Sequence, residues 1–273
     1  MRMLFGRRAA PRRSLRALLL AIMLAAAAGW AASARAQDAP TIAAAADLQF
    51  ALTEVATAFE AETGLEVKLA FGSSGNFARQ IRQGAPFQLY LSADENYVLD
   101  LARDGFTRDG GELYAVGRLV IIVPHGSPLK ADGSLDDLRA ALEDGRVQKF
   151  AIANPEHAPY GRRAEEALRH AGLWQAIQHR LVLGENASQG AQFATSGSTQ
   201  GGIIAHSLAL SPQVSALGTF ELIPAEWHAP LRQRMVLLEE AGATAERFFA
   251  FVRRPAARAI MRRFGFMLPG EES

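Results

Sequence analysis

The sequence predicts an α/β fold in which a mostly parallel β-sheet carries helices on both faces. Short apolar runs, typical of buried strands, alternate along the chain with segments whose apolar residues recur at helical spacing. Consecutive strand–helix units of this kind favour parallel strands joined by crossover helices. Because the 273 residues contain no cysteine, the fold must be held by a sizeable core and not by disulfides.

The first part of the chain contains three such units. A strand is expected at residues 41–46, and the helix after it closes at Gly64. The other elements expected here are strands at 65–71 and 87–91, a short helix ending at Gly84, and a helix capped by Asp94. Together they predict a βαβαβα order.

The middle and end of the chain repeat this alternation. Residues 119–123 form a continuous apolar run, as a strand buried on both faces should. Further strands are expected at 150–153, 201–205 and 235–238, with helices around 164–168, at 243–251 and from Pro255 to about 264.

Residues 1–36 are predicted to be a cleaved signal peptide. They contain seven arginines and no acid, and an apolar stretch follows the basic start. The segment ends with Ala34, Arg35 and Ala36, an A-x-A site before Gln37. The apolar stretch is too short and too rich in alanine for a membrane anchor, which needs ~20 apolar residues.

Removing this segment changes the charge. The whole chain has 29 Lys+Arg and 28 Asp+Glu, so the mature part has 22 bases against 28 acids, a net charge of −6. Such a protein is a poor candidate for binding nucleic acid. It must bind any anion through local dipoles and not through a basic field.

Small polar residues gather at the strand-to-helix junctions, in segments 45–47, 72–76, 154–161 and 184–188. In an open α/β sheet these junctions lie at the carboxyl ends of the strands, where ligands bind. Helix N-termini there offer free N–H groups and the positive end of the helix dipole. Each residue alone could be an ordinary helix cap. Together the junctions predict an anion site without lysine or arginine.

Six motifs occur in order along the mature chain: AAAADL at 43–48, FGSSGN at 71–76, ARQIRQGAP at 78–86, LSAD at 91–94, NPEH at 154–157 and RFGF at 263–266. With them the chain resembles the periplasmic molybdate-binding proteins of ABC transporters. The resemblance implies two lobes hinged around a central ligand cleft. It also implies a monomeric periplasmic protein, without cofactor or enzyme activity, that delivers molybdate or tungstate to a membrane permease.

The same resemblance places the domains and the ligand. After the signal peptide at 1–36, lobe 1 should span 37–117 and lobe 2 118–233, with 234–273 returning to lobe 1. The residues expected to meet the oxyanion are Asp47 and Ser74 from one lobe, and Tyr160, Ala187 and Ala205 from the other. The contacts at Tyr160 and Ala187 are expected through backbone N–H groups. No separate metal-ion site is predicted.

Asp47 stands where the family usually has serine, and Ala205 where it often has tyrosine. An ionised carboxylate facing a dianion would repel it strongly. The carboxylate could instead cap the helix that starts at Leu48, hold a proton itself, or meet a protonated ligand. We expect the cap, because aspartate is among the best N-cap residues.

Other ligands and an enzyme are the alternatives. Sulfate is smaller than molybdate, whereas phosphate carries a proton and needs an acceptor, which Asp47 could be. A serine hydrolase is the alternative from another class, but residues 72–75 do not form the G-x-S-x-G motif. The six histidines show no metal-binding spacing, and only His157 and His206 are expected near the cleft.

Overall fold

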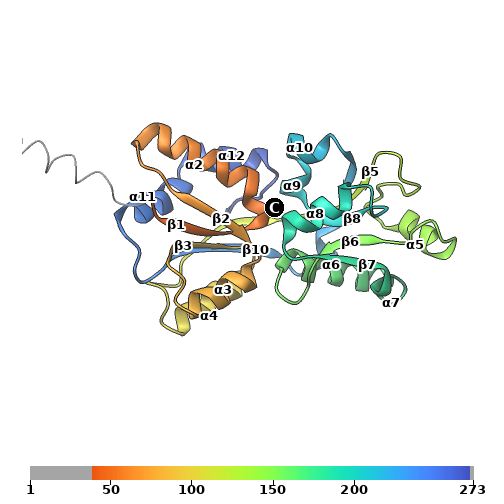
Figure 1. Ribbon diagram of the computed structural model, residues 1–273, viewed down its shortest axis with the longest axis horizontal. Coiled ribbons are helices and arrows are strands. Elements are labelled where there is room, and N and C mark those ends of the chain that lie inside the picture. Colours follow the sequence, from red (N-terminus) through yellow and green to blue (C-terminus); the bar gives the residue numbers. More distant parts are fainter. Residues whose placement is uncertain (1–38, 271–273) are drawn as a thin grey trace, which may run out of the picture. The chain divides into compact units, whose positions relative to one another are not determined.

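The computed structural model describes residues 39–270 and contains two five-stranded sheets (Figure 1). The expected signal peptide and its cleavage site lie outside the described residues. The first sheet has the order β2-β1-β3-β10-β4. Its strands are β1 (Thr41–Ala45), β2 (Lys68–Gly72), β3 (Phe87–Ser92), β4 (Glu112–Gly117) and β10 (Leu231–Leu237).

The second sheet has the matching order β7-β6-β8-β5-β9. Its strands are β5 (Leu119–Pro124), β6 (Phe150–Ala153), β7 (Leu181–Gly184), β8 (Gly202–Ala205) and β9 (Gly218–Leu222). In each sheet one strand is antiparallel to both of its neighbours, β10 in the first and β5 in the second. The other strands run in one direction, so the expected two-lobed fold with mostly parallel sheets is confirmed.

Helices cover both faces of the first sheet. Figure 1 shows α2, α11 and α12 on one side of it and α3 and α4 on the other. Their bounds are α2 (Gln49–Thr63), α3 (Ser74–Arg82), α4 (Glu95–Arg103), α11 (Ala243–Val252) and α12 (Pro255–Arg263). Gly64 ends α2 with φ 68°, and the Asp94 side chain caps α4, as the sequence predicts. Each face therefore has its own core.

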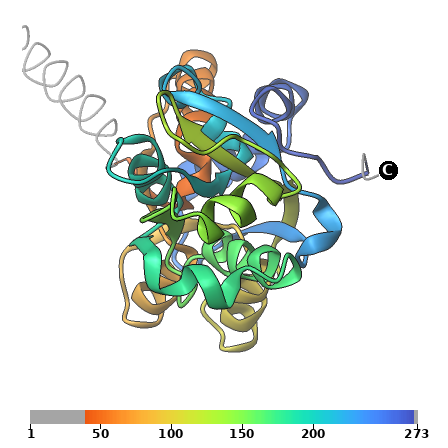
Figure 2. The ribbon, with the colours of Figure 1, turned by 90° about the vertical axis from the view of Figure 1, so that its right-hand side faces the viewer.

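The second sheet has its own set of helices, and Figure 2 looks onto this lobe from its far end. These are α5 (Asp136–Glu143), α6 (Pro159–His170), α7 (Trp174–Ile177), α8 (Ala187–Thr195), α9 (His206–Ala209) and α10 (Pro212–Ser215). Three 3₁₀ turns, η1 (Ala46–Leu48), η2 (Gln178–Arg180) and η3 (Ala225–Trp227), complete the described elements. None of the helices between residues 39 and 270 is long and apolar enough to cross a membrane.

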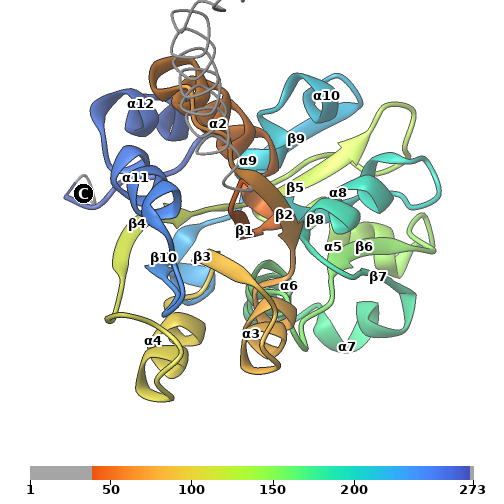
Figure 3. The ribbon, with the colours of Figure 1, turned by 60° about the vertical axis from the view of Figure 1, so that its left-hand side comes forward.

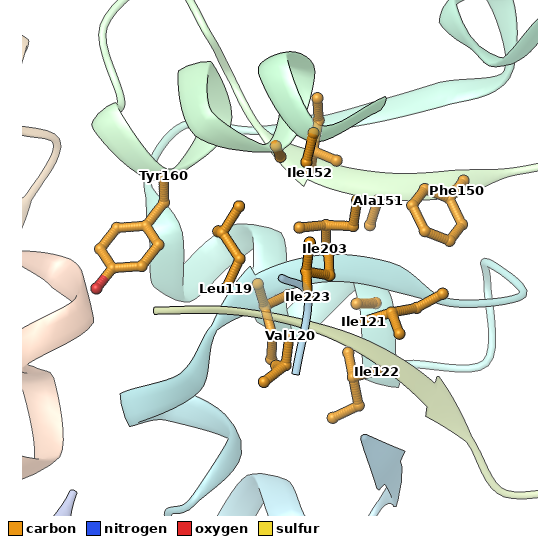
Figure 4. Packing of buried hydrophobic residues seen from close by; sticks show 14 of the residues in the cluster. Leu119, Val120, Ile121, Ile122, Phe150, Ala151, Ile152, Tyr160, Ile203 and Ile223 are labelled. Atoms are coloured by element: carbon orange, nitrogen blue, oxygen red, sulfur yellow. The ribbon is translucent and has the colours of Figure 1, made fainter. Parts of the chain in front are cut away.

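The core of the second lobe is built around β5, all of whose residues are buried. Figure 4 shows Leu119, Ile121 and Ile152 packed together. Tyr160 stands at the edge of this core with its hydroxyl directed away from the isoleucines. The aromatic ring is thus anchored in one lobe while its polar end is free to contact the other.

The chain passes between the sheets at two places. Arg118 alone separates β4 from β5, close to the first crossing expected from the sequence. Residues 232–234, where the return was expected, lie inside β10, which already begins at Leu231 opposite Gly117. The prediction missed the first residues of this strand because Arg232 and Arg234, which point outward, alternate with the buried positions and interrupt the apolar pattern.

Candidate functional site

Each of the five predicted ligand residues lies at the end of a strand or just after one, where that strand leads into a helix or turn. Asp47 follows β1, Ser74 follows β2, Tyr160 follows β6, Ala187 follows β7, and Ala205 ends β8. All five are buried. The carboxyl ends of these strands gather at one edge of each sheet, which is where open α/β sheets bind ligands.

Asp47 does not cap a helix, so the expected cap is wrong. The N-cap of η1 is Ala45 and that of α2 is Leu48, and neither makes a side-chain capping bond. A 3₁₀ turn follows β1 directly, and the carboxylate turns toward β10, where Oδ2 accepts a 2.7 Å hydrogen bond from Gln233 Nε2. The other oxygen, Oδ1, is buried and has no partner.

Gln233 organises a small polar network in the first lobe. Its Oε1 accepts a 2.7 Å hydrogen bond from the Tyr114 hydroxyl, which fixes the orientation of the amide. Its Nε2 therefore donates both to Asp47 and, over 3.1 Å, to the Tyr160 hydroxyl of the second lobe. The Tyr160 hydroxyl also interacts with the Asp47 carboxylate, so its hydrogen has an acceptor within the protein.

Burial controls the protonation of this network. It raises the pKa of Asp47 to about 6, although the hydrogen bond from Gln233 acts in the opposite direction. The pKa values of Tyr114 and Tyr160 lie well above the usual range because both phenols are buried and face the Asp47 carboxylate. Both tyrosines therefore keep their protons, whereas Asp47 titrates within the physiological range.

Ser74 is positioned as a donor. Ser73, and not Ser74, is the N-cap of α3, accepting from the Asn76 N–H. The Ser74 Oγ accepts a 3.0 Å hydrogen bond from the N–H of Ala93, so its hydrogen can point to a ligand. Its backbone oxygen accepts from the Tyr90 hydroxyl at 2.7 Å. Neither of these partners is a base that could activate a serine nucleophile.

Ala187 and Ala205 offer backbone groups. Ala187 is the first residue of α8, where helix N–H groups have no acceptor within the helix. The cap, Asn186, satisfies the N–H of Gln189 and not that of Ala187. Ala205 lies opposite Leu119 on β5. The N–H of His206, the next residue, donates to the backbone oxygen of Arg118, which directly precedes β5. Because hydrogen-bonded pairs alternate in antiparallel strands, the Ala205 N–H makes no hydrogen bond to β5.

Direct contacts join the junctions of the two lobes, and Figure 3 shows α3 beside α6. The N–H of Gly75 donates to the His157 backbone oxygen at 2.9 Å, and the Ser188 hydroxyl donates to the Ala46 oxygen at 2.9 Å. The Ser207 hydroxyl donates to the Asp47 backbone oxygen at 2.8 Å. These bonds bring the five predicted residues around η1 and the start of α3.

The histidines have separate surroundings. His157 is buried where the lobes meet, and its Nδ1 lies 3.0 Å from Ser73 Oγ. His170 is exposed on α6 and stacks on Trp227, with ring centroids 4.9 Å apart. Within residues 39–270, no group of three or more His, Asp or Glu side chains is arranged to hold a metal ion.

Sequence reasoning missed Gln233 and Tyr114. Both are buried polar side chains on strands of the first sheet, 119 residues apart in sequence, and they meet only in the folded chain. For Gln233 a signal exists, because it occupies an inward position between buried Leu231 and Met235. A polar residue on the apolar face of a strand needs a partner, which here is Asp47.

Two α/β lobes whose strand–helix junctions face each other across a shared polar site define a solute-binding protein. The family described as bacterial extracellular solute-binding protein matches residues 40–267, and the chain belongs to this family. The chain is 33% identical over 217 residues to the molybdate-binding protein ModA of Rhodobacter capsulatus, covering 78% of this chain and 82% of the relative. It is 32% identical to ModA of Azotobacter vinelandii, covering 83% and 89%.

Solved structures agree. The periplasmic molybdate-binding protein of Azotobacter vinelandii superposes with a TM-score of 0.75 at 29% identity, covering 84% of this chain and 99% of that one. The sulfate-binding protein SubI of Mycobacterium tuberculosis has a TM-score of 0.67 at 17% identity, covering 85% and 87%. The second likeness shows the fold alone.

Proposed function

We propose that the protein captures molybdate, or tungstate of nearly the same size and charge, in the periplasm and delivers it to an ABC importer. The observation that carries this proposal is the set of neutral donors aimed at one buried place. The hydroxyl of Ser74 has a hydrogen to spare, and the first turn of α8 adds backbone N–H groups. The molybdate-binding relatives support the choice of ligand.

The proposed ligand residues are Asp47, Ser74, Tyr160, Ala187 and Ala205. We assign lobe 1 to 37–117 and 234–273 and lobe 2 to 118–233, except that residues 231–233 belong to β10 and therefore to lobe 1. Export would follow cleavage of residues 1–36. Capture consists of closing the two lobes on the oxyanion, which binds the closed form through contacts with both.

Phosphate is the second candidate, and one observation favours it. The unpartnered Oδ1 of Asp47 is a buried acceptor, which a ligand bearing a hydroxyl would satisfy and a fully ionised oxyanion would not. Sulfate, like molybdate, has no proton near neutral pH, so this carboxylate does not favour sulfate over molybdate.

A thermal-shift panel with molybdate, tungstate, sulfate and phosphate tests the proposal on the exported protein. A ligand present at a hundred times its Kd stabilises the folded state by about 2.7 kcal/mol. We expect such stabilisation by molybdate and tungstate and far less by sulfate. Stronger stabilisation by phosphate would make phosphate the ligand while the protein remains a solute-binding protein. No response to any oxyanion would overturn the proposed function.

A further inference from the structure

We propose that the bound oxyanion shares one proton with Asp47, so that capture of a fully ionised dianion takes up a proton from solvent. This inference rests on the proposed function and names the chemistry of the same site. The proton leaves an acid in solvent and lies between Oδ1 of Asp47 and one oxygen of the ligand, and no covalent bond forms between ligand and protein.

One oxygen of the buried Asp47 carboxylate has no hydrogen-bond partner. The Asp47 side chain is 1% exposed, and its Oδ2 is already bound by Gln233 while Oδ1 has no partner. A buried acceptor without a donor is costly and rare in native structures. The donor that would satisfy Oδ1 must therefore come from the ligand or from a proton held at that oxygen.

The side chains around the Asp47 carboxylate do not supply a positive charge. The side chains that face it are Gln233 from β10, Tyr160 from α6 and Tyr114 from β4, all of them neutral. Ser207 of α9 contacts only its backbone oxygen. In the part of the chain that the structure describes, no lysine, arginine or histidine makes an ionic contact with Asp47.

The ionisable side chains of Asp94 and His157 interact with other residues. Asp94, which caps α4, interacts with Tyr90 of β3 and forms an ion pair with Arg163 at 3.3 Å. His157 lies 3.6 Å from the carboxylate of Glu185, on the rim between the lobes. Both groups therefore have partners of their own.

Electrostatics then decides between an ionised and a protonated complex. Two unit charges 4 Å apart at an effective dielectric of 20 repel enough to weaken binding about a thousandfold, and a dianion suffers more. A proton on Asp47 removes this repulsion and turns Oδ1 into a hydrogen-bond donor to the ligand. The site then presents hydroxyl donors from Ser74 and Asp47.

The burial that raises the pKa of Asp47 to about 6 makes this protonation accessible near neutral pH. Above that pH the free carboxylate is ionised and must gain the proton during binding. The affinity for a dianion should therefore fall with rising pH, approaching about tenfold per pH unit. Below pH 6 the affinity should become flat.

The test is a calorimetric titration of the exported protein with molybdate at pH 8, in two buffers that differ in their heat of protonation. The difference between the apparent enthalpies gives the number of protons taken up. We expect close to one proton for the native protein and close to none for Asp47→Asn. The amide introduced by this substitution can still accept from Gln233, and its N–H₂ can replace the shared proton as a donor.

The matched control is Asp100→Asn, an exposed carboxylate on α4. It should take up the same proton as the native protein. Molybdate binding without proton uptake by the native protein would overturn this inference and leave the proposed function standing. Uptake that persists in Asp47→Asn would assign the proton to another group and also overturn it. If neither molybdate nor tungstate binds, both proposals fail.

Discussion

Gly75 gives the most direct test of how the lobes meet. It is the second residue of α3, and its N–H donates to the backbone oxygen of His157 in the other lobe. A Cβ atom added at this position would lie 2.8 Å from that oxygen, 3.1 Å from the His157 Cα and 2.8 Å from the hydroxyl oxygen of Tyr97. The tyrosine is the end of a side chain and can move, but the His157 backbone cannot.

The size of the effect follows from this geometry. In Gly75→Ala the lobes must stay apart by several tenths of an ångström. The interlobe hydrogen bond is then lost or stretched, which costs about 0.5–1.5 kcal/mol. Overpacking in a tight contact adds about 1–3 kcal/mol. A combined loss of roughly 2–4 kcal/mol weakens molybdate binding between about thirty- and several-hundredfold.

The assay is calorimetric affinity for molybdate, together with the melting temperature without ligand. The substitution should leave the ligand-free protein as stable as before or slightly more so, because alanine exceeds glycine in helix propensity by ~1 kcal/mol. Gly110→Ala is the matched control, since nothing lies within 4 Å of its added Cβ and its φ is not positive. Native affinity in Gly75→Ala would refute the reasoning that closure requires this contact.

Three further predictions concern the site and its export. Ser74→Ala should weaken molybdate binding about ten- to a hundredfold, because a buried hydroxyl bond to a charged group contributes ~1.5–3 kcal/mol; unchanged calorimetric affinity would exclude a direct contact. Asp47→Asn should stabilise the ligand-free protein at pH 8 by up to about 3 kcal/mol, and this gain should vanish near pH 4. The sign follows because burial raises the pKa of Asp47 from 3.8 to about 6, so the folded state loses stability as the pH rises through that range; melting temperatures that do not differ at pH 8 would contradict it. Mass spectrometry of the exported protein should find Gln37 at the N-terminus, and a full-length species as the only product would count against cleavage.

The sequence predicts most of the fold because local patterns specify it. Apolar runs mark the buried central strands such as β5, and Gly64 and Asp94 mark helix ends through their own backbone chemistry. The elements it misses are those with weak local patterns. The edge strand β9 is mostly exposed, so its residues show neither a continuous apolar run nor a clean alternation.

The site is predicted only in part, for a different reason. The motifs locate the junctions that contain Ser74 and Tyr160, because short segments after strands are recognisable in sequence. The direction of the Asp47 side chain depends on Gln233, which lies 186 residues away. Local propensity favours a helix cap at an aspartate in this position, but here a tertiary hydrogen bond determines its orientation.

The hydrogen bond from Gln233 to Tyr160 has a consequence for release. Gln233 belongs to a strand of the first sheet and Tyr160 to a helix of the second lobe, so opening the lobes must separate them. Water then reaches Asp47, and the pKa of its carboxyl returns toward the ordinary value. The ionised carboxylate would face the dianion at the moment the lobes part. A transporter that opens the lobes would thereby weaken the binding of the dianion, and would not need a higher affinity of its own to receive it.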